Sequence, residues 1–190
     1  MAKLESNLKT MVLSLFGVCA VASGLLGYMN SITEGPIAES KAKAKLEAIQ
    51  KVVPEFNNNP SEEKYVLSSD LGDLECFPAK KDGELVGTAI STRTNIAFSG
   101  SFSIMVGLKP DGTLINTSVL EHKETPGLGT KMMDPKFKDQ FPGKNPGKNK
   151  IKVKKDGGEI DAITAATITS RAFCDAVMRA YNAYQKGDQQ

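Results

Sequence analysis

A long uncharged run opens the hydrophobic pattern of this chain. No charged residue occurs from Met11 to Met29. As an α-helix rising about 1.5 Å per residue, this run would be about 28 Å long, close to the hydrocarbon thickness of a bilayer. A secretory signal peptide is the alternative, because Ala20-Val21-Ala22 has the small-x-small pattern of a cleavage site. Since the apolar run continues well beyond Ala22, we expect an uncleaved transmembrane helix over residues 11–29. The flanking charges only weakly favour a cytoplasmic N-terminus, residues 1–10.

Apolar residues then recur at helical spacing in two further segments. Residues 30–36 are expected to form a linker, and Ile37–Val53 an amphipathic helix that ends before Pro54. This helix would cover a sheet, or would serve as a stalk or docking surface. The last element is expected to run from Ser170 to about Gln185. Its apolar stripe consists of Phe173, Val177, Ala180, Tyr181 and Tyr184.

The middle of the chain is rich in β-branched and apolar segments, which predict strands. These segments are Glu84–Ile90, Ile96–Phe98, Phe102–Leu108 and Leu114–Leu120. Lys109-Pro110-Asp111-Gly112 has the composition of a hairpin turn between the last two. The expected fold class is therefore α+β, a mostly antiparallel sheet packed with helices and preceded by one N-terminal transmembrane helix.

Two polar stretches follow the predicted strands. Asp134-Pro135 has the pattern of a helix N-cap and first residue, which predicts a short helix over Pro135–Phe141. Lys144–Lys155 holds six lysines. Because Ile151 and Val153 alternate with lysines there, we expect a charged edge strand. A docking face for nucleic acid or lipid headgroups is the alternative.

Composition narrows the classes of function. Lys and Arg number 24 and Asp and Glu 22, so the net charge is +2, which argues against a nucleic-acid-binding protein. The three cysteines are far apart and the chain has one histidine, which argues against a structural zinc site, a haem-attachment motif and a Cys–His hydrolase. Spacing does not establish whether Cys76 and Cys174 form a disulfide.

Hydroxyl residues cluster where a strand is expected to enter the last helix, in the segment Asp161–Ser170. The simplest interpretation is that Thr169 or Ser170 caps the helix. The alternative is an anion site, because free N–H groups at a helix N-terminus favour phosphate. The segment has no lysine and no glycine-rich P-loop spacing, so an ATPase is not supported.

A second candidate loop spans His122–Lys131. Its Pro126-Gly127 pair suits a type II turn, and Gly127 and Gly129 permit a flat ligand to approach the backbone. A tight surface turn would explain the Pro-Gly pair equally well. One histidine, His122, is weak evidence for catalysis.

Together these two segments resemble one family. Asp-x-x-Thr-Ala-Ala-Thr at 161–167 is similar to a flavinylation motif, and Glu-Thr-Pro-Gly-Leu-Gly at 124–129 is similar to the flavin-contacting loop of the same FMN-binding domains. With one N-terminal span, the chain resembles the G subunits of Rnf complexes, the ion-translocating ferredoxin:NAD+ oxidoreductases. Residues 98–103, Phe-Ser-Gly-Ser-Phe-Ser, depart from the Gly-Tyr-Gly-Gly-like stretch expected there.

The resemblance implies a covalent cofactor, FMN, joined by a phosphodiester to the Thr167 hydroxyl by a separate flavin transferase that uses FAD and magnesium. Asp161 would help that transferase. The resemblance implies no catalytic residue acting alone and no resident metal. The other candidate cofactor-binding residues are Glu124, Thr125, Leu128, Gly129, Thr130, Asp161 and Thr164.

The resemblance also implies location and partners. Residues 37–190 would be an extracytoplasmic domain on the periplasmic side of the cell inner membrane, held by a single span in membrane lipid. The partners would be the other subunits of the membrane complex, with no nucleic acid. The alternatives are the C subunit of the sodium-translocating NADH:quinone oxidoreductase, which shares both motifs, and a cofactor-free membrane-anchored assembly module.

Overall fold

The computed structural model describes residues 7–187, which fall into two compact units, 1–43 and 44–190. The first six residues of the predicted cytoplasmic segment and the last three of the predicted domain lie outside the described range. The folded unit contains β1 (Tyr65–Leu67), β2 (Leu74–Lys81), β3 (Glu84–Ala97), β4 (Gly100–Leu108) and β5 (Leu114–Glu121). Its short helices are η1 (Gly129–Met133), α2 (Pro135–Lys138) and η2 (Lys154–Asp156), and α3 spans Thr167–Gly187.

The first helix, α1, spans Leu8–Val52. Its N-terminal part is long and apolar enough to cross a membrane by length and composition, and its apolar side chains are exposed. Residues 30–36, expected to be a linker, are helical, although Pro36 lies among them. The Thr33 hydroxyl donates a hydrogen bond to the Met29 carbonyl at 2.8 Å. Proline removes only one backbone donor, and the Ala-, Glu- and Lys-rich sequence that follows has high helix propensity.

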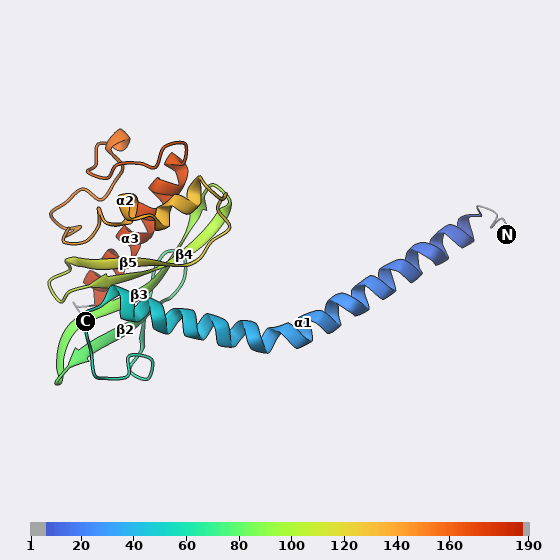
Figure 1. Cartoon of the computed structure of the whole chain (residues 1–190), viewed down its shortest axis with the longest axis horizontal. Coiled ribbons are helices and arrows are strands. Elements are labelled where there is room, and N and C mark those ends of the chain that lie inside the picture. Colours follow the sequence, from blue (N-terminus) through green and yellow to red (C-terminus); the bar gives the residue numbers. More distant parts are fainter. Residues whose placement is uncertain (1–6, 188–190) are drawn as a thin grey trace. The chain divides into compact units, whose positions relative to one another are not determined.

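The five strands form one antiparallel sheet in chain order, β1-β2-β3-β4-β5, which confirms the expected α+β class. Side chains alternate between its two faces, so Ile104 and Val106 belong to one core and Met105 to the other. Helix α3 covers the first face and the last turns of α1 cover the second (Figure 1). The folded unit is therefore a sheet between two helical layers.

The predicted strands were incomplete in two places. Strand β3 is continuous over Glu84–Ala97, so Ile96–Phe98 is not a separate strand. Strands β1 and β2 were not predicted, because β2 contains Pro78 and several charged residues. Proline is tolerated there because β1 pairs only with residues 74–76 of β2, and the Asn58 side chain covers the open edge beyond, donating to the Pro78 carbonyl at 2.9 Å.

The last turns of α1 pack closely on the sheet. Ala48, Ile49 and Val52 are buried, and the helix ends before Pro54 as predicted. Leu46, an apolar residue of the same predicted helix, is exposed. Lys45 and Lys64 both bond to Glu75 of β2, and the hydrogen bond from Lys45 is the main reason that the pKa of Glu75 lies below its usual range.

Four phenylalanines join α2, β4 and α3 on the other face. The rings of Phe137 and Phe173 meet edge to face with centroids 5.3 Å apart, and Phe102 and Phe141 pack on Phe173. Helix α2 has Pro135 at its start as predicted, but it ends at Lys138 and Asp134 makes no side-chain capping bond. This cluster supports the segment that leads into α3.

The edge strand expected within Lys144–Lys155 is wrong. Ile151 and Val153 are buried in the core that includes α3, whereas Lys152, the residue between them, is exposed. The predicted alternation is therefore present, but it occurs in a loop. Instead of joining the sheet, Val153 forms an isolated parallel bridge with Ile160, after a loop in which Gly157 has a φ of 77°. Cys76 and Cys174 are free thiols, and burial raises the pKa of each to about 12.

Candidate flavin site

Three segments meet around one cavity of about 310 Å³, a volume at the low end of the range for small-molecule sites. Phe98 comes from the β3–β4 turn, and the two other segments are the loop before η1 and the start of α3. The two sequence motifs, which are far apart in the chain, therefore share one wall. The lining residues are Phe98, Glu124, Thr125, Leu128, Gly129, Ala165, Ala166, Thr167, Ile168 and Thr169.

The loop before η1 has the turn predicted for it. The Leu128 N–H donates to the Thr125 carbonyl at 3.2 Å, and Gly127 has a φ of 76°, the left-handed value that position i+2 of a type II turn requires. The Thr130 hydroxyl accepts a hydrogen bond from the Gly127 N–H at 2.9 Å. Thr130 therefore supports the loop and does not line the cavity.

Helix α3 starts at Thr167, three residues earlier than predicted. Neither Thr169 nor Ser170 caps it, because both lie inside the first turn. The Ser170 hydroxyl accepts from the Ile163 N–H and donates to the Ala166 carbonyl, each at 2.9 Å. Ala165 sits at the sharp turn just before the helix with a φ of 62°, an uncommon value for a residue with a Cβ.

The start of α3 retains unused donors. Within residues 7–187, the N–H groups of Thr167, Ile168 and Thr169 donate no hydrogen bond to the protein, whereas the Ser170 N–H reaches the Ala166 carbonyl at 3.0 Å. Such groups, together with the positive end of the helix dipole, stabilise a bound phosphate. Thr167 is half-buried and its side chain is on the cavity wall. These residues therefore fit a phosphate ester on Thr167 with an apolar group beside it.

Glu124 joins all three segments. Its carboxylate accepts hydrogen bonds from the Ser99 N–H at 3.1 Å and from the Thr169 hydroxyl at 2.9 Å. Gly129 lies against this side chain so closely that a Cβ at position 129 would collide with it. Sequence reasoning found Glu124 only through the resemblance, since no local pattern predicts contacts across 45 residues.

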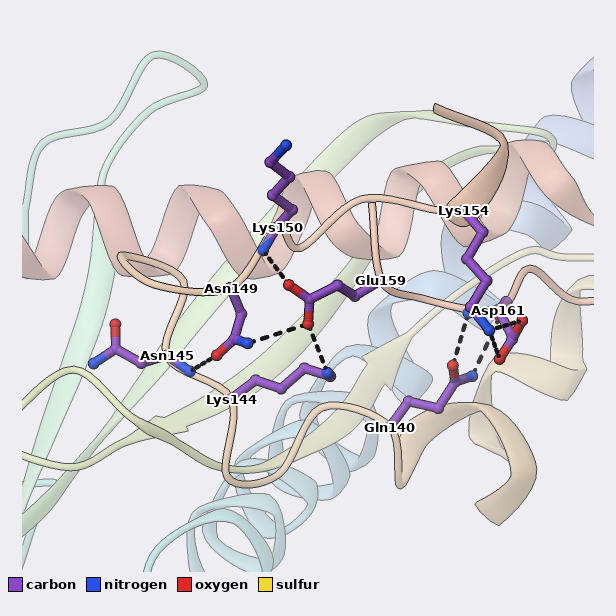
Figure 2. Close-up of polar contacts among 8 residues, drawn as sticks. All are labelled: Gln140, Lys144, Asn145, Asn149, Lys150, Lys154, Glu159 and Asp161. Atoms are coloured by element: carbon purple, nitrogen blue, oxygen red, sulfur yellow. Dashed lines mark hydrogen bonds and ion pairs between the residues drawn. The ribbon is translucent and has the colours of Figure 1, made fainter. Parts of the chain in front are cut away.

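Asp161 and Thr164 lie elsewhere. They line a second cavity of about 450 Å³ together with Lys131, Asp134 and other residues of the η1–α2 segment. Figure 2 shows the Asp161 carboxylate in an ion pair with Lys154 at 2.8 Å and its backbone held by the Gln140 side chain, at 2.7 Å on N–H and 3.2 Å on the carbonyl. Of the predicted site residues, the structure therefore gathers Thr167, Glu124, Thr125, Leu128 and Gly129.

Sequence reasoning missed part of the cavity wall. Phe98 is 68% exposed and Ile168 46% exposed, and both are apolar side chains at the mouth of the cavity. Exposed aromatic and branched side chains beside a cavity are a signal for a flat apolar ligand. Phe98 lies in the stretch that departs from the family pattern, and Ile168 follows the motif, so neither stood out.

Comparison with known proteins agrees with this geometry. Residues 98–182 match the FMN-binding domain family. The chain is 33% identical to the G subunit of the Na(+)-translocating ferredoxin:NAD(+) oxidoreductase complex of Acetobacterium woodii, over 91% of this chain and 89% of that protein. It is 37% identical to the G subunit of the ion-translocating oxidoreductase complex of Yersinia pestis, over 91% and 90%.

Among solved structures, the NqrC protein of Shewanella oneidensis matches with a TM-score of 0.46 and 17% identity, over 72% of this chain and 70% of that one. The Acetobacterium and Yersinia relatives are both G subunits, and both align with this chain almost end to end. The chain therefore belongs to the family of G subunits of Rnf-type ion-translocating oxidoreductase complexes, and it is a redox subunit with an FMN-binding domain.

Proposed function

We propose that this chain carries FMN covalently, through a phosphodiester on the Thr167 hydroxyl, and passes electrons between other subunits of its complex. The observation that carries the proposal is the position of Thr167, on the cavity wall and at the end of α3 that has unused N–H donors. When bound, FMN supplies the redox chemistry, and the protein supplies position and electrostatics.

Different residues around the cavity would hold different parts of FMN. The first turn of α3 provides N–H groups for the phosphate, whose remaining negative charge a helix N-terminus stabilises by roughly 0.3–1 kcal/mol. Thr125 and Leu128 on one wall and Phe98 on the other would bound the flavin ring. A covalent tether keeps the cofactor in place when free FMN is scarce.

Asp161 acts, in this proposal, on the flavin transferase and not on the bound flavin. It lines the second cavity, six residues before Thr167, and its carboxylate is exposed. Hard carboxylate oxygens suit the magnesium ion that the transferase reaction would use. Lys154 must release this carboxylate before it binds a metal. Thr164 lines the same cavity, but the proposal gives its hydroxyl no part in flavin attachment.

The acceptor is tested by co-expressing the full chain with a flavin transferase and measuring intact mass and flavin fluorescence after denaturation. The wild-type protein should carry one FMN. Thr167→Ala should carry none, while Thr164→Ala, which removes an exposed hydroxyl three residues away, should retain it. A flavin that persists in Thr167→Ala would place the acceptor elsewhere. Absence of covalent flavin from the wild-type protein would favour the cofactor-free assembly module.

A companion variant tests the role given to Asp161. Asp161→Asn should slow flavin attachment but leave thermal unfolding unchanged, because the side-chain amide of Gln140 bonds to the Asp161 backbone. Full and equally fast attachment would show that the carboxylate has no part in maturation.

We also propose that α1 anchors the protein as a single span over residues 11–29, with the domain over 37–190 on the periplasmic side. The uncharged run and its exposed apolar side chains support the anchor. Glu55 offers a probe, since its side chain is 92% exposed. A cysteine placed there by Glu55→Cys should react with a membrane-impermeant maleimide added outside spheroplasts. Labelling only in inverted vesicles would show that the domain lies on the cytoplasmic side.

A further inference from the structure

Glu124 is a buried carboxylate on the wall of the proposed flavin cavity. It is 5% exposed. Among the ion pairs of the described residues, none includes Glu124, so no lysine or arginine neutralises it directly. Burying a charge without a counterion is costly unless hydrogen bonds or dipoles compensate for it. The surroundings of Glu124 therefore need an explanation.

Both side-chain contacts of Glu124 use its oxygens as hydrogen-bond acceptors. One oxygen accepts the Ser99 N–H at 3.1 Å and the other accepts the Thr169 hydroxyl at 2.9 Å. Thr169 is in the first turn of α3, where the helix dipole favours negative charge. These groups stabilise the charge without cancelling it, because both are neutral dipoles.

We infer that Glu124 lowers the reduction potential of the cofactor in this cavity by holding a fixed negative charge at its wall. The inference rests on the proposed function. Electrons added to a flavin raise its negative charge unless protons follow, and a nearby carboxylate in a water-poor site opposes that change. Glu124 is thus a positioning residue for the three segments and an electrostatic determinant of the potential.

Glu124→Gln separates charge from packing. Glutamine has the same shape, its carbonyl can accept the Ser99 N–H, and its amide can donate to the Thr169 hydroxyl, which rotates to accept. The flavin-loaded full chain in detergent is titrated with dithionite and redox mediators, and flavin absorbance is followed. The midpoint potential of Glu124→Gln should shift to more positive values. Glu121→Gln is the control, because it removes the same charge from an exposed residue three positions earlier, and it should leave the potential unchanged.

A second variant should shift the potential the other way. Thr169→Val keeps the side-chain volume but removes the hydroxyl dipole that partly offsets the charge of Glu124. Because loss of this donor also favours protonation of the carboxyl group, both proteins are titrated at about pH 9 to keep it ionised, and the potential should then become more negative. If the two substitutions only loosened the site, their shifts in midpoint potential would not be expected to have opposite signs. If Glu124→Gln does not load flavin, the negative shift of Thr169→Val still tests the inference.

The outcomes are distinct. Flavin attached at Thr167 with the potential of Glu124→Gln unchanged or more negative would overturn the charge assignment alone. A shift in Thr169→Val that is absent or positive would also overturn it. A wild-type chain that carries no flavin would refute the proposed function, and this inference with it.

Discussion

The Ser170 hydroxyl accepts a hydrogen bond from the backbone N–H of Ile163 at 2.9 Å and so ties the first turn of α3 to the segment that precedes it. The same hydroxyl donates to the Ala166 carbonyl, also at 2.9 Å. Both bonds are buried, and they close the turn that holds Thr167 at the cavity. A serine that looks like a helix cap in the sequence is therefore a clamp on the turn before the helix.

Removal of this clamp should be costly. Ser170→Ala leaves the buried Ile163 N–H without an acceptor, so we expect a loss of about 1–3 kcal/mol in the free energy of unfolding. Chemical denaturation of the full chain in detergent measures this loss. Thr164→Ala is the control, since Thr164 is exposed and only a few residues away. Equal stability of the two variants would mean that the clamp contributes nothing.

Ala165 has a strained backbone, and a substitution that relieves this strain should stabilise the protein. Because its φ is 62°, glycine at this position should relieve the strain, and Ala165→Gly should raise the free energy of unfolding by roughly 0.5–1 kcal/mol. Ala165→Val should lower it, because a β-branched residue tolerates positive φ poorly. Thermal unfolding of the three proteins should rank glycine above alanine and alanine above valine. A lower melting temperature for the glycine variant would contradict the strain.

Contact between α1 and the sheet depends on Gly107. A Cβ at this position of β4 would overlap the Val52 carbonyl at the end of α1. Gly107→Ala should therefore push the last turn of α1 off the sheet and destabilise the folded unit by about 1–3 kcal/mol, as overpacking does. The matched control is Gly83→Ala, which meets no atom within 4 Å, although its φ of 88° adds a strain of its own. Hydrogen exchange at Ile49 and Val52 should increase only in the Gly107 variant.

Acid should destabilise the loop over residues 144–155, because the Glu159 carboxylate holds it by hydrogen bonds. Figure 2 shows its carboxylate bonded to the Lys150 N–H at 2.9 Å, the Lys144 ammonium at 3.0 Å and the Asn149 amide at 3.1 Å. The backbone bond from Lys150 is the main cause that lowers the pKa of Glu159 from 4.5. A lowered carboxyl pKa stabilises the folded state above pH 4.5, and this contribution is lost as the pH falls through the folded-state value.

Glu159→Gln should therefore melt earlier than the wild-type protein at pH 7 and approach it at a pH well below 4.5. Thermal melts across that range measure the difference. Glu47→Gln, at an exposed position on α1, serves as the control and should show no such convergence. If the difference in melting temperature persists unchanged in acid, Glu159 acts through its shape and not through its charge.

Local patterns were sufficient for much of the fold. The apolar stripe of Phe173, Val177, Ala180 and Tyr184 requires a buried helix, because apolar side chains at helical spacing gain most when they share one face. The Lys109–Gly112 turn lies between β4 and β5 as predicted, with Gly112 at a φ of 79°. These features depend on neighbours in sequence, which is why the sequence by itself determined them.

Other features depended on partners distant in the chain. The burial of Ile151 and Val153 allowed either an edge strand or a loop, and only the return of the chain to Ile160 decided for the loop. The division of the motif between two cavities, with Asp161 on one and Thr167 on the other, follows from the turn at Ala165. The sequence alone indicated the two motifs, parts of which line the cavity. Only the tertiary structure brought Glu124 to Thr169, because a buried hydrogen bond between distant segments forms only when the whole core packs.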